Sequence, residues 1–236
     1  MTAPLAPGAL PVGEDKTRRV REMFDTIAPR YEAVNRIMTF GLDAKWRART
    51  VRALGLPAGS VVLDIATGTG DLSVEAARQG LRPVGFDLSL GMLAASRSST
   101  PVAECDAAGL PVPDGVADGV LCGYALRNFT DLGACFAEMA RVLRPGGRVA
   151  LLEVCEPTGR LTHAGFSLWF NKAVPLIGGV VSDAAAYRYL PKSVAYLPGA
   201  DELHEMLRDV GFSGVNRHML SGGLSQLLAA TREGVA

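Results

Sequence analysis

The spacing of apolar positions changes near residue 59 and divides the chain into two parts. Between residues 16 and 54, apolar side chains recur every three or four positions, as Val20, Phe24 and Ile27 do, and this spacing predicts two or three helices. Beyond residue 59, short β-branched runs alternate with helical patterns. We therefore expect an N-terminal helical cap over residues 14–56, followed by a segment in which strands and helices alternate.

The alternation in the second part predicts the fold class. The expected strands cover residues 60–65, 83–86, 102–105, 119–123, 148–154, 215–220 and 224–231, and the expected helices cover residues 71–79, 89–97, 131–143 and 201–210. Such alternation is typical of a parallel sheet with helices on both faces. Only Ser221, Gly222 and Gly223 join the last two strands, which permits only an antiparallel hairpin. We predict an α/β fold with a doubly wound, mostly parallel seven-stranded sheet and one antiparallel strand.

Two segments fall outside this alternation. Residues 1–13 are rich in Pro, Ala and Gly and are expected to form a disordered tail before a single domain over residues 14–236. Residues 156–198 are expected to form a mostly helical insert. Within it, residues 164–181 are strongly apolar but are interrupted by Asn, Lys, Pro and a Gly pair, which argues against a membrane span.

Composition and charge narrow the function classes. The 236 residues are 48% hydrophobic, enough for a sizeable core, and the formal net charge is zero, so nothing global favours a nucleic-acid partner. The four cysteines form no CxxC pair, which argues against a zinc or dithiol site and fits reduced thiols in the cytoplasm. No metal site is expected.

The stretch VVLDIATGTGDLS, residues 61–73, predicts a strand, a glycine loop and a helix start. Gly68 and Gly70 let the backbone approach a ligand closely. A dinucleotide would call for a glycine where Ser73 stands, and its pyrophosphate would meet the carboxylate of Asp71. The loop therefore disfavours NAD.

Three consecutive strands each deliver an aspartate to the carboxyl edge of the sheet, where open α/β sheets bind ligands. S-adenosyl-L-methionine carries no phosphate, and its ammonium and sulfonium groups are positive. Asp64 could attract the ammonium, Asp87 with its neighbour Leu88 could meet the ribose hydroxyls, and Asp106 with the N–H of Ala107 could contact the adenine. The alternative is that these aspartates only cap turns and helices.

Several stretches resemble a known family. LDIATGTGD, FDLSLGML and CDAAGLPVPDGVADGV are similar to motifs of class I, Rossmann-like S-adenosylmethionine-dependent methyltransferases. YEAVNRIMTFGLDAKW (31–46) and RVLRPGGRVALLEVC (141–155) resemble the two signatures of the ubiquinone/menaquinone biosynthesis C-methyltransferases. The first signature matches at Tyr31, Asn35 and Trp46. The chain departs from the two patterns at Glu32, Val34, Thr39, Asp43, Arg144 and Cys155.

The resemblance implies cofactor contacts at matching positions. These fall on Thr69, Asp87, Asp106 and Ala107. Where family members often have a serine contact this chain has Gly123, so any contact there comes from the backbone.

The resemblance also implies the reaction, which is C-methylation of a prenylated quinol ring. Arg127 is expected to stabilise the developing phenolate; the alternative is that it pairs with a carboxylate such as Asp131. Asn128 is expected to orient the substrate or to cap a loop. Tyr31 is expected to touch the ring or the cofactor's methionine end, or to pack in the core.

The acceptor expected from the resemblance is demethylmenaquinol, which becomes menaquinol. The alternatives are the ubiquinone precursor 2-polyprenyl-6-methoxy-1,4-benzoquinol, another phenol or lipid, and a non-catalytic scaffold that binds S-adenosyl-L-methionine. The insert is the expected substrate cover, and residues 164–181 could line a groove for the polyprenyl tail, contact a membrane surface or pack as ordinary core. We expect a cytoplasmic protein that could also bind peripherally at the inner face of the plasma membrane. Whether it forms a homo-oligomer is left open.

Overall fold

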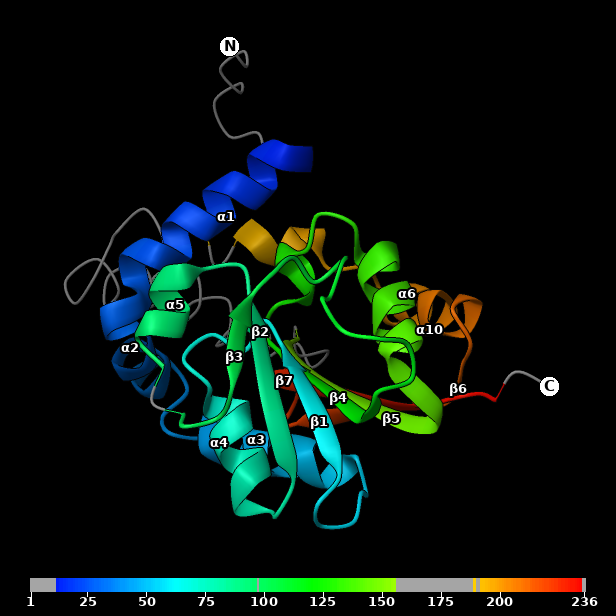
Figure 1. The fold of residues 1–236 in the computed structure, drawn as a ribbon. Coiled ribbons are helices and arrows are strands. Elements are labelled where there is room, and N and C mark those ends of the chain that lie inside the picture. The colour runs from blue at the N-terminus through cyan, green and yellow to red at the C-terminus, as the bar shows by residue number, and fades with distance from the viewer. Residues whose placement is uncertain (1–11, 97, 156–188, 190–191, 235–236) are drawn as a thin grey trace.

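The computed structural model in Figure 1 describes residues 12–96, 98–155, 189 and 192–234. The α-helices are α1 (Gly13–Ile27), α2 (Tyr31–Met38), α3 (Asp43–Ala53), α4 (Asp71–Arg78), α5 (Leu90–Ala94), α6 (Leu132–Val142) and α10 (Ala200–Asp209). The strands are β1 (Val61–Ile65), β2 (Arg82–Asp87), β3 (Val102–Glu104), β4 (Ala117–Gly123), β5 (Leu143–Val154), β6 (Phe212–Leu220) and β7 (Ser225–Arg232). Short 3-10 helices are η1 (Ala28–Arg30), η2 (Leu126–Asn128) and η4 (Val194–Tyr196).

The strands form one seven-stranded sheet in the order β3-β2-β1-β4-β5-β7-β6. All neighbouring pairs from β3 to β5 are parallel, and β7 is antiparallel to both β5 and β6. This confirms the predicted fold class, including the single antiparallel strand. β5 begins earlier than expected because Leu143 pairs with Ala117 ahead of the Pro-Gly-Gly turn, where the register shifts.

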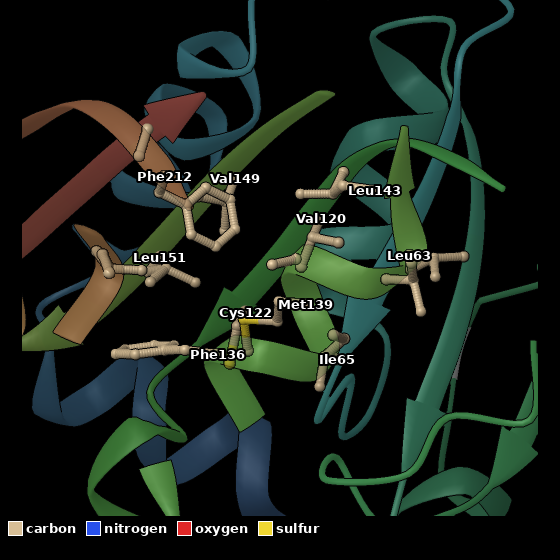
Figure 2. Packing of buried hydrophobic residues seen from close by; sticks show 14 of the residues in the cluster. Leu63, Ile65, Val120, Cys122, Phe136, Met139, Leu143, Val149, Leu151 and Phe212 are labelled. Carbon is tan, nitrogen blue, oxygen red and sulfur yellow. The ribbon is translucent and has the colours of Figure 1, made fainter. Parts of the chain in front are cut away.

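The two faces of the sheet bury different side chains, as the alternation of a strand requires. On one face Val62 and Leu121 pack in a cluster with residues of α3 and α4. On the other face Leu63, Val120 and Leu151 pack in a cluster with residues of α6 and α10, part of which Figure 2 shows. Helices thus cover both faces of the sheet, and its carboxyl edge is left for a ligand.

Two helices begin at a residue whose side chain caps the first turn. The hydroxyl of Ser89 accepts a hydrogen bond from the N–H of Met92 at 3.0 Å at the start of α5. The carboxylate of Asp131 accepts one from the N–H of Ala134 at 2.9 Å at the start of α6. These caps satisfy backbone donors that a helix start would otherwise leave unpaired. α5 is shorter than predicted and ends at Ala94.

Most of the expected insert over residues 156–198 lies outside the described residues, and so does the apolar stretch 164–181. The part of the chain that the structure describes contains no helix long and apolar enough to cross a membrane.

Leu151 lies in the middle of the sheet, fully buried, and contributes to the cluster in Figure 2. We expect Leu151→Ala to lower the free energy of unfolding by about 2–5 kcal/mol, because it leaves a cavity in a close-packed core. Leu90→Ala, where the side chain is 53% exposed, is the matched control and should change it by less than about 1 kcal/mol. Urea unfolding measures both; equal effects would contradict this assignment of the core.

Candidate active site

A pocket of about 590 Å³ opens above the carboxyl ends of the parallel strands, between the sheet and the helical cap. Of the predicted site residues, all but Gly70 line it: Tyr31, Asp64, Gly68, Thr69, Asp87, Leu88, Asp106, Ala107, Gly123, Arg127 and Asn128. The sequence-based grouping of these residues at one edge of the sheet therefore matches their placement. Their individual roles remain predictions.

Asp64 is a buried carboxylate at the end of β1. Its Oδ2 accepts hydrogen bonds from the hydroxyls of Thr67 and Ser73, both at 2.7 Å, which fastens the glycine loop to the start of α4. Its Oδ1 has no hydrogen-bond partner among the described residues, and the residue is 1% exposed. Burial raises the pKa of Asp64 to about 6, against the lowering effect of the two hydroxyls. An unpaired oxygen in this position suits a cationic ligand.

The next two strands place their aspartates on the same pocket. Asp87 accepts hydrogen bonds from the N–H of Gly68 and of Ser89, each at 2.8 Å, so it also holds the glycine loop in place. Burial raises the pKa of Asp87. Asp106 accepts a hydrogen bond from the N–H of Ala108 at 2.9 Å. These aspartates therefore also cap turns, as the alternative interpretation expected, because each accepts a hydrogen bond from the backbone around the pocket.

The structural reason for a glycine differs among the predicted glycine positions of the site. Gly70 has a positive φ of 86°, and an added Cβ would lie 2.8 Å from the Ser96 Oγ, so this glycine serves the turn into α4. Gly68 also has a positive φ and faces the pocket. At Gly123 an added Cβ would lie 2.8 Å from the Leu72 Cδ1. A serine at this position would therefore require Leu72 to move.

Arg127 lies in η2 after β4 and is 5% exposed. Its Nη1 pairs with the carboxylate of Glu153 and donates to the carbonyl of Tyr124 at 2.8 Å, while its Nε donates to the Ser193 hydroxyl at 3.0 Å. The expected alternative partner, Asp131, caps α6 instead. Nη2 makes no hydrogen bond to any described residue.

Asn128 and Tyr31 both line this pocket. Asn128 is 8% exposed, and its Oδ1 lacks a hydrogen-bond partner among the described residues. Tyr31 packs edge-on against Phe24, with ring centroids 5.9 Å apart, and hydrogen-bonds to Asn35. Burial is the main cause that raises the pKa of Tyr31.

Sequence reasoning missed the residues that support the site from other segments. Glu153 on β5 is fully buried beside Arg127; a charged residue inside the apolar run VALLEV was the available signal. Asp25 on α1 accepts from the Ser89 hydroxyl at 2.5 Å and from a backbone N–H of α5. Arg47 on α3 pairs with Asp43 and Asp71. The Arg47–Asp43 pair has the i,i+4 spacing of a single helix, whereas the other contacts join distant segments that no local pattern brings together.

Comparison with known proteins identifies the family. The model of the ubiE/COQ5 methyltransferase family matches residues 12–232, nearly the whole chain. The chain belongs to the ubiE/COQ5 methyltransferase family. This confirms the predicted family, and with it a methyltransferase that uses S-adenosyl-L-methionine.

Two curated relatives agree with this membership. The ubiquinone/menaquinone biosynthesis C-methyltransferase UbiE of Geobacter sulfurreducens is 40% identical, with 84% of this chain and 82% of the relative covered. The demethylmenaquinone methyltransferase of Deinococcus radiodurans is 41% identical, with 86% and 89% covered. Among solved structures, the [4+2]-cyclase SpnF matches with a TM-score of 0.68 at 16% identity, covering 96% of this chain and 99% of that one. The last likeness concerns the fold alone.

The residues around the pocket of this ubiE/COQ5 family member fit the cofactor. The unpaired Oδ1 of Asp64 suits an ammonium group, and Gly68 and Gly123 line the pocket with backbone alone. Among the described residues, no group of three or more His, Cys, Asp or Glu side chains could hold a metal ion.

The raised pKa of Asp64 makes the stability of the free protein depend on pH. Its folded value of about 6 exceeds the ordinary 3.8, so the folded state binds more protons between these values and stability falls as the pH rises through this window. Relative to Asp64→Asn, the wild type should lose on the order of 2–3 kcal/mol between pH 4 and pH 7. Urea unfolding at each pH measures the difference; parallel curves for the two proteins would contradict the assignment.

Proposed function

We propose that the protein methylates a ring carbon of a prenylated quinol and converts demethylmenaquinol to menaquinol. The observation that carries this proposal is the pocket itself, which is lined by three strand-end aspartates together with Arg127 and Asn128. The aspartates suit a cationic, sugar-bearing cofactor, and the arginine and the amide suit a phenol. Family membership supports the methyl transfer, and the names of the relatives support the quinol.

When bound, S-adenosyl-L-methionine supplies an electrophilic methyl group on a sulfonium. The protein's contribution is to hold the quinol carbon in line with that methyl and to increase its electron density. Asp64, Asp87 and Asp106 hold the donor's charged and hydroxyl groups along the sheet edge. Alignment of the two reactants alone can lower the barrier by roughly 7–11 kcal/mol in the most favourable cases. A new C–C bond replaces the C–S bond, and the ring carbon loses its proton.

Arg127 is the proposed catalytic cation. The quinol carbon becomes more nucleophilic as the neighbouring oxygen loses its proton, and a guanidinium stabilises the charge that develops there. The Nη1 of Arg127 is held by Glu153 and the carbonyl of Tyr124, and its Nε is held by Ser193. Nη2 is left for the substrate. A fixed donor needs no reorganisation when charge develops, so these contacts favour catalysis as well as folding.

Asn128 and Tyr31 are proposed to position the ring. A buried amide oxygen without a partner is costly, and a quinol hydroxyl is a donor that would satisfy Oδ1 of Asn128. The ring of Tyr31, held by Phe24 and Asn35, offers an aromatic wall.

The ubiquinone precursor 2-polyprenyl-6-methoxy-1,4-benzoquinol is the second candidate acceptor, because several relatives carry names that include both quinones. A polyprenyl substrate resides in the membrane, so we also propose that the protein works at the inner membrane surface. Residues 164–181, the sequence-based candidate for this contact, lie outside the described residues. An assembly of identical chains stays a prediction.

A direct assay tests the acceptor. Purified protein with S-adenosyl-L-methionine and reduced demethylmenaquinone should give a product heavier by one methylene, detected by mass spectrometry. The benzoquinol precursor, supplied at the same concentration, tests the second candidate. A cell lacking the protein should accumulate demethylmenaquinone. Donor binding without transfer to either quinol would instead favour the non-catalytic scaffold.

Arg127→Lys tests the catalytic cation while leaving a positive charge for Glu153 to pair with. We expect kcat to fall about 10²–10³-fold, the usual effect of removing one fixed donor from a developing oxyanion, with S-adenosylhomocysteine affinity within about threefold of wild type. Arg144→Lys is the control, since Arg144 is 55% exposed and pairs with Asp118 away from the pocket. Steady-state kinetics and calorimetry give both quantities, and near-normal turnover in Arg127→Lys would remove Arg127 from the mechanism.

A further inference from the structure

The order of the strands fixes the direction in which the cofactor lies. Asp106 follows β3 and Asp87 ends β2, so the adenine and ribose ends lie toward β3. The amino-acid end then lies toward β1 and β4, beside Asp64 and the start of α4. That end is a zwitterion, and its α-carboxylate calls for a cation.

Three arginines line the pocket within the described ranges, and their positions differ. Arg21 pairs with Glu104 on β3, at the adenine end. Arg127 pairs with Glu153 and is the proposed contact of the substrate. Arg47 alone among them stands beside the helix that follows the glycine loop, because α3 packs against α4 (Figure 1).

The surroundings of Arg47 form a mixed-charge group that complements a zwitterion. Its Nη1 pairs with the carboxylate of Asp71, the first residue of α4, and its Nη2 pairs with Asp43 one turn earlier on α3. Asp43 is also held by the hydroxyl of Thr39 at 2.9 Å. The arginine side chain is only 17% exposed. Its Nε makes no hydrogen bond to a described residue, so the guanidinium keeps donors for a further acceptor.

The charges nearby also favour this pairing. Asp43, Asp71 and Arg47 together carry a net charge of −1, and Asp64 stands on the same pocket. An ammonium would be attracted to these carboxylates, and Arg47 offers the accompanying carboxylate a complementary positive charge beside α4. Arginine suits such a site because its planar fork binds a carboxylate through two parallel N–H donors.

We infer that Arg47 binds the α-carboxylate of the methionyl group of S-adenosyl-L-methionine, with Asp43 and Asp71 positioning its guanidinium. The inference deepens the proposed function and rests on it. It makes α3, part of the N-terminal cap, a wall of the cofactor site as well as of the substrate space.

Calorimetry with two ligands tests the inference without any turnover. The ligands are S-adenosylhomocysteine and its decarboxylated analogue, which keeps the amino group and lacks only the carboxylate. For Arg47→Gln we expect S-adenosylhomocysteine to bind about 10–100-fold more weakly, the loss of a charge-assisted contact, and the analogue to bind within about threefold of wild type. Arg47→Lys should recover part of the lost affinity.

Arg52→Gln is the matched control, since Arg52 lies on the same helix and is exposed. It should change neither affinity. A thermal melt of each variant confirms folding. Equal weakening of both ligands in Arg47→Gln would overturn the inference in favour of a purely structural role for the α3–α4 contact, and so would no weakening at all. If the wild type binds neither ligand, the proposed function fails, and the inference fails with it.

Discussion

A carboxylate held out of water at the end of β1 is the constraint on which the site depends. Asp64 fastens the glycine loop through one oxygen and leaves the other without a partner among the described residues. Burial disfavours its charge, so a cation is favoured beside it and a diphosphate is disfavoured. Asp87 holds the same loop from the next strand, so the arrangement that selects the ligand is also the one that shapes the loop.

The sheet and its acid-lined edge could be predicted from the sequence because both follow from local patterns. Alternating strands and helices fix a parallel sheet, and residues at the ends of parallel strands meet at one edge. Gly70 shows where this reasoning stops. The sequence predicts a ligand-contacting glycine there, and the structure adds a second requirement: its positive φ and the closeness of Ser96 demand a glycine for the turn, although it does not line the pocket.

Contacts between distant segments could not be predicted in the same way. The sequence suggested Asp131 as a partner for Arg127 because it is near in the chain, yet the pairing of β4 with β5 brings Glu153 to the guanidinium. Arg47 and Asp71 meet only because α3 packs on α4. Such pairs depend on the complete fold. A glutamate inside an apolar strand, such as the fully buried Glu153, is a sequence signal that indicates a buried ion pair.

The likeness to SpnF shows that this fold can support a different reaction, so the chemistry must reside in the residues above the sheet. In this chain the cap supplies many of them. α1 reaches α5 through Asp25, α2 brings Tyr31 to the pocket, and α3 brings Arg47 to the start of α4. Because these helices line the same pocket as the strand-end aspartates, a substitution in the cap changes the space in which the proposed cofactor and quinol must align.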